Sequence, residues 1–435
     1  MISYFVAMEK GSTNSQVSFF NKYFSDAAAS LPQRPLKHGE CQTAAGQKCT
    51  LCLAHRINYD DEYRIKNTAL QEYWKVHRFP QPIHPLVPSP FGRNYRIVTK
   101  RKVFSSNGKL QLGLIGTDDE AAGIHPLQVG QCMIEPFAHS EIYRCVQDYL
   151  NRKEFREVAE AMNYVVVKGN YEEFTVIFNV ASMDSNRRQF INHLSKHLTK
   201  TTNGVIGVFT YIDEKRSRFY LPQRQKNQKL QFQKIFGKDA IFHRAVSKKF
   251  LYSPLSFSQT NLSIVEEFVS TAEEMLELNG SDQVFDLYCG YGLFSLSVAD
   301  KIRNVTGVEL SGDSIRDAKR NAERMHIENC KFIERDIDEE CLERIFSSHS
   351  KITKVILDPP RNGTKPGVIE IITAKKIERV LHIFCNIELM PAELERWNSG
   401  GYKIARAIPF DMFPGTGEVE MMVALDPTSV STRKS

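Results

Sequence analysis

Cys385 is a candidate nucleophile at the end of an apolar stretch. It follows "LHIF" of residues 381–384, and Glu420 lies downstream in "FPGTGEVE". A thiolate is a strong nucleophile and a carboxylate can accept a proton, so the two residues have the chemistry of a nucleophile and a general base. A packed core thiol is the simpler interpretation of "LHIFCNI" alone, and the neighbouring motifs have to decide between the two.

A glycine turn lies between a predicted strand and a predicted helix in "DLYCGYGLF". Gly290 and Gly292 carry no side chains, so the backbone there can approach a ligand at the start of the helix. Glu309 ends the next predicted strand, where its carboxylate can accept hydrogen bonds from both hydroxyls of a ribose. The turn lacks the third glycine of a dinucleotide fingerprint and the Gly-Lys-Ser/Thr of a triphosphate site. This pattern suits an adenosine without a pyrophosphate and indicates S-adenosylmethionine.

Two further acids follow predicted strands. Asp358 begins "DPPRNG", and open α/β sheets bind ligands at this carboxyl edge, where the two prolines would fix an extended loop. In nucleic-acid methyltransferases an acid-Pro-Pro loop beside the methyl donor faces the target base, whereas the alternative is a rigid turn between elements. Asp336 in "IERDID" is a candidate partner of the adenine amino group, and a helix cap or a solvated acid would explain it equally well.

The order of predicted elements gives these residues a scaffold. Strands alternate with helices in the last part of the chain, which predicts a parallel, doubly wound sheet. Residues 402–426 read as two strands joined by Pro-Gly-Thr-Gly, so we expect an antiparallel pair at one edge of that sheet. The region before it is α+β in character, with a hairpin turn at "SSNG", strands at 162–170, 172–180 and 204–213, and a helix at 185–199.

Composition is that of a globular protein of two or three domains. The chain has 435 residues, of which 42% are hydrophobic and 25% charged. It contains no apolar run close to the roughly 18 residues of a membrane span, and "MISYFVAMEK" lacks the features of a secretory signal. We therefore expect a cytoplasmic protein with no membrane partner. Nine cysteines without a signal peptide indicate buried, metal-bound or catalytic thiols and not a disulfide scaffold.

Five motifs in order resemble those of the RNA uracil-5-methyltransferase family: "SFSQTN", "DLYCGYG", "LDPPRNG", "FCN" and "FPGTGEVE". The resemblance covers nearly the whole chain after residue 40. It implies a Rossmann-like, S-adenosylmethionine-dependent methyltransferase domain that makes 5-methyluridine in RNA. It also implies that Cys385 is the nucleophile and Glu420 the general base. The same resemblance implies that Gln259, Tyr288, Glu309 and Asp358 contact the methyl donor. The glycine turn adds Gly290 to this set.

Three cysteines cluster in "CQTAAGQKCTLC", which resembles the iron–sulfur segment of the family's ribosomal-RNA members. A fourth ligand is implied by the resemblance of "QVGQCMIEP". A 4Fe-4S cluster is thereby assigned to Cys41, Cys49, Cys52 and Cys132. Four thiolates would equally hold zinc, and incidental buried thiols are the plainer alternative.

The sequence departs from the family pattern at several positions. Ile387 stands where a proline commonly follows Cys-Asn, Leu293 where an asparagine often meets the cofactor, and Glu418 where a histidine often precedes the catalytic glutamate. Glu418 competes with Glu420 for the role of base, since two residues of one strand that are two apart point the same way. Asn386 and Arg361 are candidates for holding the enolate oxygen or the base.

Contact with RNA is expected from the segment 215–238. It contains eight Lys or Arg and no acid, with aromatic residues interleaved, so it can neutralise phosphates and stack bases. A solvated basic loop beside core aromatics is the alternative. "NYRIVTKRK" at 94–102 is a second candidate surface. The expected partner is structured RNA, ribosomal in preference to transfer RNA, with no obligate protein partner evident and a loop uridine as the target.

These features divide the chain into four predicted parts and leave other functions open. The parts are an extension at 1–37, a cysteine-rich iron–sulfur segment at 38–79, a central α+β RNA-binding domain at 80–255 and the methyltransferase domain at 256–435.

The alternatives are a transfer-RNA uracil-5-methyltransferase and an enzyme methylating cytosine carbon 5 or an exocyclic amine. An iron–sulfur RNA-binding protein with a vestigial methyltransferase fold is the non-enzymatic alternative.

Overall fold

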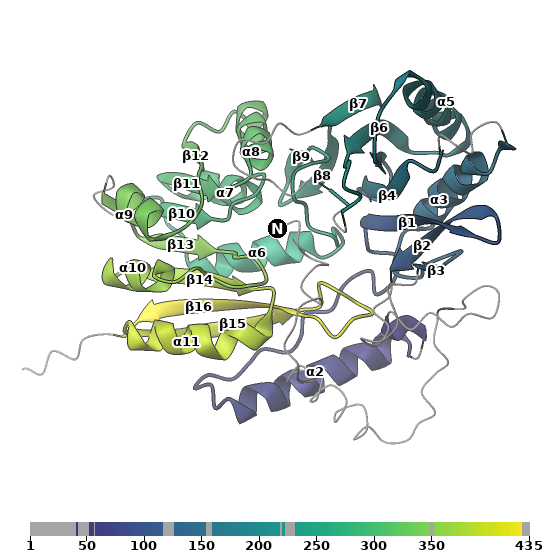
Figure 1. Ribbon diagram of the computed structural model, residues 1–435. Coiled ribbons are helices and arrows are strands. Elements are labelled where there is room, and N and C mark those ends of the chain that lie inside the picture. The colour runs from purple at the N-terminus through teal and green to yellow at the C-terminus, as the bar shows by residue number, and fades with distance from the viewer. Residues whose placement is uncertain are drawn as a thin grey trace, which may run out of the picture.

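The computed structural model describes two seven-stranded sheets and the helices that cover them (Figure 1). The described residues are 41, 52–55, 57–115, 126–153, 159–217, 220–221, 231–347 and 352–428. Outside them lie the predicted extension at 1–37 and Cys49. Four cations of the segment 215–238 also lie outside them: Arg218, Arg224, Lys226 and Lys229.

The C-terminal sheet has the strand order β12-β11-β10-β13-β14-β16-β15. The first five of these strands are parallel, and β16 runs antiparallel to both β14 and β15. The predicted doubly wound sheet with an antiparallel edge is therefore confirmed. Its strands are β10 (Gln283–Leu287), β11 (Asn304–Glu309), β12 (Cys330–Glu334), β13 (Lys354–Leu357), β14 (Arg379–Phe384), β15 (Tyr402–Phe410) and β16 (Glu420–Pro427).

Helices cover both faces of this sheet and close two separate hydrophobic cores. One core is shared by α9 (Glu339–Ser347), α10 (Val368–Ala374), α11 (Met390–Ser399) and α2 (Tyr59–Val76). The other is shared by α6 (Val265–Leu276), α7 (Leu293–Val298), α8 (Gly312–Met325) and the hairpin of β8 (Ile241–Ala245) and β9 (Lys248–Tyr252). The central strands β10, β13 and β14 are buried on both faces, as a parallel sheet covered by helices requires, whereas the edge strand β12 is partly exposed.

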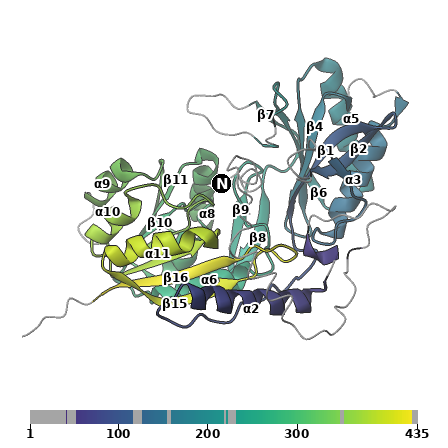
Figure 2. The ribbon, with the colours of Figure 1, turned by 60° about the horizontal axis from the view of Figure 1, so that its bottom comes forward.

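The central sheet has the order β3-β2-β1-β4-β5-β6-β7, and the helices described in this region lie on one of its faces. Figure 2 shows it nearly edge on, with α3 and α5 on the side away from the C-terminal sheet. The predicted "SSNG" turn joins β1 to β2, with Asn107 and Gly108 at positive φ. The elements are β1 (Val98–Ser106), β2 (Lys109–Ile115), β3 (Pro126–Gln128), α3 (Phe137–Leu150), β4 (Met162–Gly169), β5 (Phe174–Val180), α5 (Ser185–Thr201), β6 (Val205–Ile212) and β7 (Phe232–Gly237).

The segment before the central sheet packs on the C-terminal sheet. Helix α2 lies along β15 and β16 in both ribbon views (Figures 1 and 2). The chain after it lies beside the edge strand β15, where the amides of His84 and Val87 donate to the carbonyls of Ala407 and Pro409. The exposed edge of the sheet is thereby paired. None of the helices in the described ranges is long and apolar enough to span a membrane.

Candidate active site

The glycine turn between β10 and α7 is tied to the end of β11. One oxygen of the Glu309 carboxylate accepts a hydrogen bond from the Gly290 amide at 3.3 Å, and the other accepts one from the Ser311 amide at 2.7 Å. Gly290 has a positive φ of 56°, and a Cβ built on it would meet no atom within 4 Å. The turn therefore opens onto space in which a ligand can approach both the backbone and Glu309.

Asp286, on β10 below this turn, is a buried carboxyl with one satisfied oxygen. That oxygen accepts from the backbone amide of Ser295 at 2.9 Å and from its hydroxyl at 2.6 Å, whereas the other has no hydrogen-bond partner among the described residues. Burial raises the pKa of Asp286 to about 6, and the nearby charge of Glu309 adds to this rise. A buried, unsatisfied oxygen beside the turn fits a cationic or hydrogen-donating part of a bound ligand.

Two more predicted cofactor residues, Tyr288 and Asp336, lie near the turn. Tyr288 adopts a positive φ of 68°, and its pKa is raised by burial and by the charges of Asp336, Glu393 and Glu309. Asp336 lies at the rim, where its carboxylate pairs with Lys365 at 2.5 Å. The structure therefore brings Tyr288, Asp336 and Glu309 together on one side of the turn.

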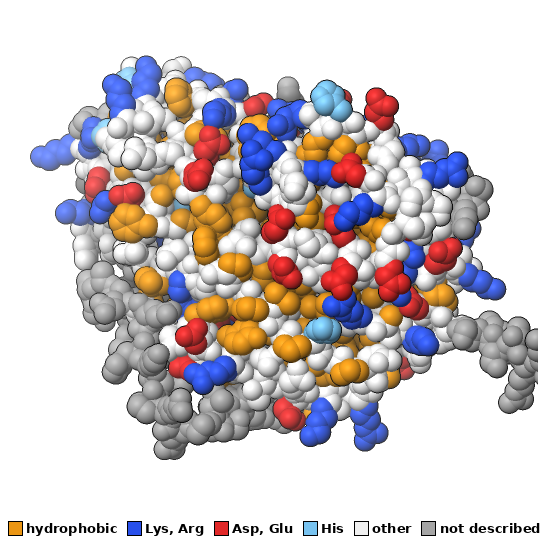
Figure 3. Space-filling view, turned by 180° about the vertical axis from the view of Figure 1, so that it is seen from behind, with side chains coloured by type: hydrophobic (Ala, Val, Ile, Leu, Met, Phe, Trp, Pro, Cys, Tyr) orange, Lys and Arg blue, Asp and Glu red, His pale blue; other side chains and the backbone are white. Residues whose placement is uncertain are grey.

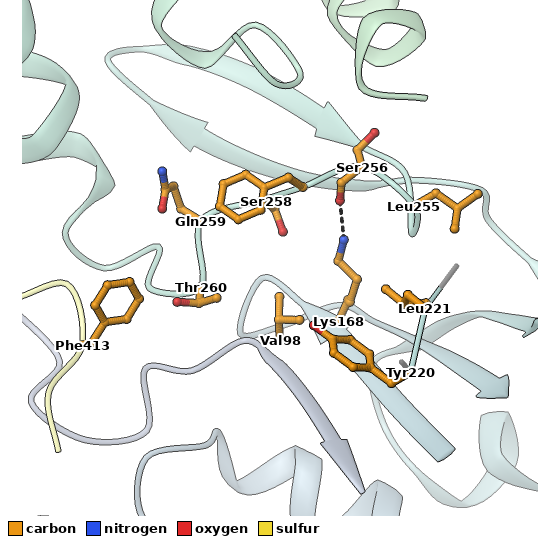
Figure 4. A pocket seen from close by; sticks show the side chains of 11 residues that line it. Val98, Lys168, Tyr220, Leu221, Leu255, Ser256, Ser258, Gln259, Thr260 and Phe413 are labelled. Atoms are coloured by element: carbon orange, nitrogen blue, oxygen red, sulfur yellow. Dashed lines mark hydrogen bonds between the residues drawn. The ribbon is translucent and has the colours of Figure 1, made fainter. Parts of the chain in front are cut away.

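Gln259 lies in a buried loop between the two sheets. It lines a pocket with residues of the central sheet, including Val98 and Lys168, and with Phe413 (Figure 4). Lys168 is buried on β4 and donates to the carbonyls of Pro254 at 3.2 Å and Ser256 at 2.6 Å. Burial lowers the pKa of Lys168 to about 7. Lys168 thus fixes the loop that carries Gln259, and no local pattern in the sequence predicts this contact.

A pair of carboxyl groups lies at the edge of the sheet where β13 ends and β16 begins, on either side of β14. Burial raises the pKa of Asp358 well above its usual range, and the charges of Glu420, Asp286 and Glu309 raise it further. Burial also raises the pKa of Glu420 to about 8, and the guanidinium of Arg361 opposes this rise. Two neighbouring carboxyl groups with raised pKa values hold a proton near neutral pH, because both cannot ionise without repulsion.

The loop after Asp358 is anchored from helix α11. Glu393 on α11 accepts hydrogen bonds from the amide and the hydroxyl of Thr364, both at 2.7 Å. Gly363 has a φ of 76°, and a Cβ there would lie 2.5 Å from the same carboxylate oxygen. The "DPPRNG" motif is therefore a fixed loop at the carboxyl edge of the sheet.

Cys385 follows the last residue of β14 at this same edge. Its thiol is 3% exposed and lies 3.6 Å from the carbonyl oxygen of Pro359. The side chain of Asn386 donates to the carbonyl of Arg361 at 3.1 Å, which ties the cysteine loop to the "DPPRNG" loop. Ile387 is buried, and its carbonyl accepts from the Tyr73 hydroxyl on α2 at 2.6 Å. The residue that replaces the usual proline is thus a core residue whose backbone is held from α2.

Glu418 and Glu420 have different surroundings. Strand β16 begins at Glu420, so Glu418 lies in the preceding turn, and the two side chains do not share one strand face. Glu418 forms an ion pair with Arg361 at 2.6 Å and is about a third exposed, whereas Glu420 is 3% exposed. Glu418 and Glu420 would point the same way only if both belonged to one strand, and they do not. Glu420 remains the better-placed candidate for the base.

Three of the four candidate cluster cysteines are described. Cys52 and Cys132 pack together with Tyr95 and Ile134, and the amide of Cys41 donates to the carbonyl of Ala54 in the turn that follows Cys52. Burial raises the pKa of Cys132, and the nearby Cys52 adds to the rise. Cys49 lies outside the described residues, and among those that are described no group of three or more His, Cys, Asp or Glu side chains is arranged to hold a metal.

A buried network near these cysteines was not anticipated. Lys66 on α2 pairs with Asp411 at 2.8 Å and with Glu62 at 3.0 Å, and all three side chains are fully buried. Glu62 also accepts from the Gly415 amide at 2.5 Å. The network holds the loop that leads to Glu420. The sequence signal for this network is that two charged residues, Glu62 and Lys66, lie on the apolar face of the predicted helix.

Comparison with known proteins identifies the family. The sequence model described as tRNA (Uracil-5-)-methyltransferase matches residues 211–428, which is half of the chain. This chain belongs to the RNA uracil-5-methyltransferase family. The family resemblance expected from the five motifs is therefore confirmed.

Individual relatives of the family match with different coverage. The 23S rRNA (uracil(1939)-C(5))-methyltransferase RlmD of Aliivibrio fischeri strain MJ11 is 36% identical over 185 residues, which is 42% of this chain and 42% of that protein. The match thus spans less than half of that relative's length. An uncharacterized RNA methyltransferase of Clostridium tetani is 27% identical over 398 residues, which is 89% of this chain and 84% of that protein.

One solved structure shares the fold of most of the chain. The Pyrococcus abyssi tRNA (uracil-54, C5)-methyltransferase, crystallised with S-adenosyl-L-homocysteine, superposes with a TM-score of 0.62 at 20% sequence identity. The superposition covers 86% of this chain and 84% of that one. The Rossmann-like methyltransferase fold of this uracil-5-methyltransferase family member is therefore as predicted.

Proposed function

We propose that this chain is an S-adenosylmethionine-dependent RNA methyltransferase that forms 5-methyluridine in structured RNA. The observation that carries the proposal is the meeting of three groups at one edge of the C-terminal sheet. These are the Cys385 thiol, the carboxyl pair of Asp358 and Glu420, and the Gly290 turn with Glu309. A nucleophile, a base and a nucleoside site are what methylation of a pyrimidine carbon requires.

The methyl donor supplies an electrophilic methyl group when it is bound. The side chains around the turn have the donors and acceptors that its adenosine and amino acid parts need. Glu309 would take the ribose hydroxyls, and Asp286 offers an unsatisfied oxygen to an amino group. Gln259, Tyr288, Asp336 and Asp358 complete the proposed binding set, with Gly290 leaving the space.

Cys385 would activate the uracil by covalent addition. The thiolate forms a bond to carbon 6, and the electron pair of the carbon 5–carbon 6 double bond moves toward carbon 5 and the carbonyl oxygen at carbon 4. Carbon 5, now nucleophilic, would form its bond to the methyl group as the bond between that methyl and the sulfonium sulfur breaks; the electron pair goes to sulfur and S-adenosylhomocysteine is the leaving group. Positioning supplies much of the rate. Cysteine suits this step because a few per cent of a thiol is already ionised at neutral pH and the thiolate is a good leaving group.

Glu420 would complete turnover by removing the proton from carbon 5. The electrons of that carbon–hydrogen bond then re-form the double bond, and the thiolate leaves carbon 6. The raised pKa of Glu420, about 8, makes it a stronger base than an exposed glutamate once it has lost its proton. Arg361 favours that ionised form, and its ion pair with Glu418 fixes where it lies.

Ribosomal RNA is the substrate we favour, because the cysteine segment resembles that of ribosomal-RNA members of the family. A transfer-RNA substrate is the alternative, and the names of relatives include both RNA classes. We also propose that Cys41, Cys49, Cys52 and Cys132 hold a 4Fe-4S cluster, with zinc as the alternative metal. Support comes from the joint packing of Cys52 and Cys132 and from the placement of Cys41 beside the same turn.

The test is covalent trapping on RNA that contains 5-fluorouridine. Fluorine at carbon 5 cannot leave as a proton, so the enzyme should accumulate a covalent adduct that forms only when S-adenosylmethionine is present. Cys385→Ala should form none, and Cys341→Ala, which changes another buried thiol, should form it normally. Absence of adduct with both ribosomal and transfer RNA would favour the non-enzymatic alternative, an iron–sulfur RNA-binding protein whose departures at Ile387 and Leu293 have cost it activity.

A further inference from the structure

A second pocket lies at the end of the central sheet that is remote from the active site. It has a volume of about 530 Å³ and is formed by the end of β1, the starts of β2 and β4, the end of α3 and the loop after β6. Its cationic side chains are Lys109, Arg152, Lys153 and Arg216. We call this the distal basic pocket.

The walls of the distal basic pocket are held in place by hydrogen bonds. Asn151, at the end of α3, accepts from the Leu110 amide at 2.9 Å and donates to the Leu110 carbonyl at 2.8 Å. Gln147 accepts from the Leu112 amide at 2.9 Å, so the helix end is fixed to β2 at two points. The pocket is therefore part of the folded sheet and helix.

Two of the cations are oriented by specific contacts. The guanidinium of Arg152 lies over the ring of Tyr149, 4.3 Å from its centroid. Arg216 has a positive φ of 46° and donates to the carbonyl of Glu160 at 2.5 Å. A strained backbone at an exposed arginine is a cost of the kind found at functional sites.

The charge around this pocket is unbalanced. Among the described residues that line it, four are cations and one, Glu160, is an acid. Lys102 on the adjoining strand has a lowered pKa, first because it is partly buried and then because Arg216 repels it, while Asp213 offsets this in part. Seen from behind, Lys and Arg side chains gather along the outer margin of the central domain, at the left of Figure 3. Such a concentration of positive charge attracts anions.

Strand β1 connects the distal basic pocket to the active site. Val98, at the start of β1, lines the pocket that contains Gln259, and Val103, Phe104 and Ser105 line the distal one. At about 3.4 Å per residue the two pockets are roughly 20 Å apart. Between them Lys100 lies over the ring of Tyr220 at 4.3 Å, and Lys102 lies over that of Tyr164 at 4.5 Å. Two cations of β1, Lys100 and Lys102, thus lie between the two pockets.

We propose that the distal basic pocket binds the phosphate backbone of the substrate RNA, outside the segment that enters the active site. The inference rests on the proposed function for the identity of the ligand. Several open, solvent-accessible cations with a single acid match a polyanion that continues beyond the pocket. The pocket sets affinity and orientation and takes no part in the chemistry.

The test measures RNA binding without the methyl donor. We compare the wild type with R152A/K153A/R216A. The long probes are bulk ribosomal RNA and bulk transfer RNA, and the short probe is an oligouridylate too short to span roughly 20 Å. At about 0.1 M salt the variant should bind the long RNAs at least about tenfold more weakly, and its salt slope should fall by about 2 to 3, because three phosphate contacts are lost. The short probe should bind both proteins equally.

A matched control removes the same charge elsewhere. Lys331, Lys375 and Lys403 are exposed on the C-terminal domain, and K331A/K375A/K403A should lose little affinity. R152E/K153E leaves Arg216 and its hydrogen bond intact, so it tests the pocket without disturbing the loop. In methylation assays the pocket variants should raise KM and leave kcat unchanged.

The outcomes separate this inference from the proposed function. An equal loss of affinity in the pocket and control variants, or an equal loss on the short and long probes, overturns the distal site even if the enzyme methylates RNA. Preferential binding of an acidic peptide over RNA at the pocket overturns it as well. A pocket-dependent loss of RNA binding in a protein that methylates no RNA supports the site and overturns the proposed activity.

Discussion

Replacing Glu420 with glutamine should make the protein more stable at alkaline pH while it stops turnover. The pKa of Glu420 is raised from 4.5 to about 8 by burial. Between these pH values the folded protein holds a proton that the unfolded chain has released, so the free energy of unfolding falls as the pH rises. Glutamine cannot titrate, so the variant should not show this loss.

The size of the effect follows from the two pKa values. Each pKa unit corresponds to about 1.36 kcal/mol, so the wild type should lose about 3 to 4 kcal/mol more than Glu420→Gln between about pH 5 and pH 8. Urea unfolding followed by the fluorescence of the two tryptophans, Trp74 and Trp397, both of which are buried, measures this difference. Asp358→Asn and the double variant of Asp358→Asn with Glu420→Gln complete a double-mutant cycle. The cycle measures how far the protonation of Asp358 and that of Glu420 depend on each other.

The same variant tests the catalytic role. Loss of a general base costs about 10²- to 10⁴-fold in rate, and the methylated covalent adduct should accumulate on ordinary RNA because its release needs the base. If the wild type and Glu420→Gln lose stability in parallel as the pH rises, the buried carboxyl does not carry the proton and the reasoning fails. If the variant turns over normally, Glu420 is not the base.

Three other substitutions probe the surroundings of the site. Lys168→Met removes the hydrogen bonds to the Pro254 and Ser256 carbonyls. Calorimetry should show that the variant binds S-adenosylhomocysteine more weakly by about 1 to 3 kcal/mol. Equal affinity would show that the loop does not need these hydrogen bonds. Glu418→Gln breaks the ion pair with Arg361 and should lower the single-turnover rate less than Glu420→Gln does; the reverse order would make Glu418 the base. Cys132→Ser should reduce iron content and visible absorbance together, and unchanged iron would exclude Cys132 as a ligand.

The residues at the sheet edge could be predicted because they follow strands. Asp358 and Cys385 come directly after apolar stretches, and Glu309 ends one, so the alternation of strands and helices already brings them to one edge. The hairpin at Asn107 and Gly108 was equally predictable, because its turn residues are specific to that geometry. Local sequence carries this kind of information.

Contacts between distant segments could not be predicted in this way. Nothing near Lys66 indicates that it meets Asp411, and nothing near Lys168 indicates that it holds the loop of Gln259. Period-two reasoning also failed to separate Glu418 from Glu420, because the strand begins between them. Helices α3 and α6 were not among the predicted elements, although each buries a clear apolar face in the folded protein.

The seat of α2 on the last strands has a consequence for how the chain folds during its synthesis. Tyr73 and Lys66 find their partners at Ile387 and Asp411, more than three hundred residues later in the sequence. Domains that emerge early usually fold first, but this helix must wait, with a lysine and an apolar face unburied, until β15 has been made. The loop that leads to Glu420 can therefore be completed only after both α2 and β15 have been made, and a chaperone that shields α2 until then should raise the yield of active protein.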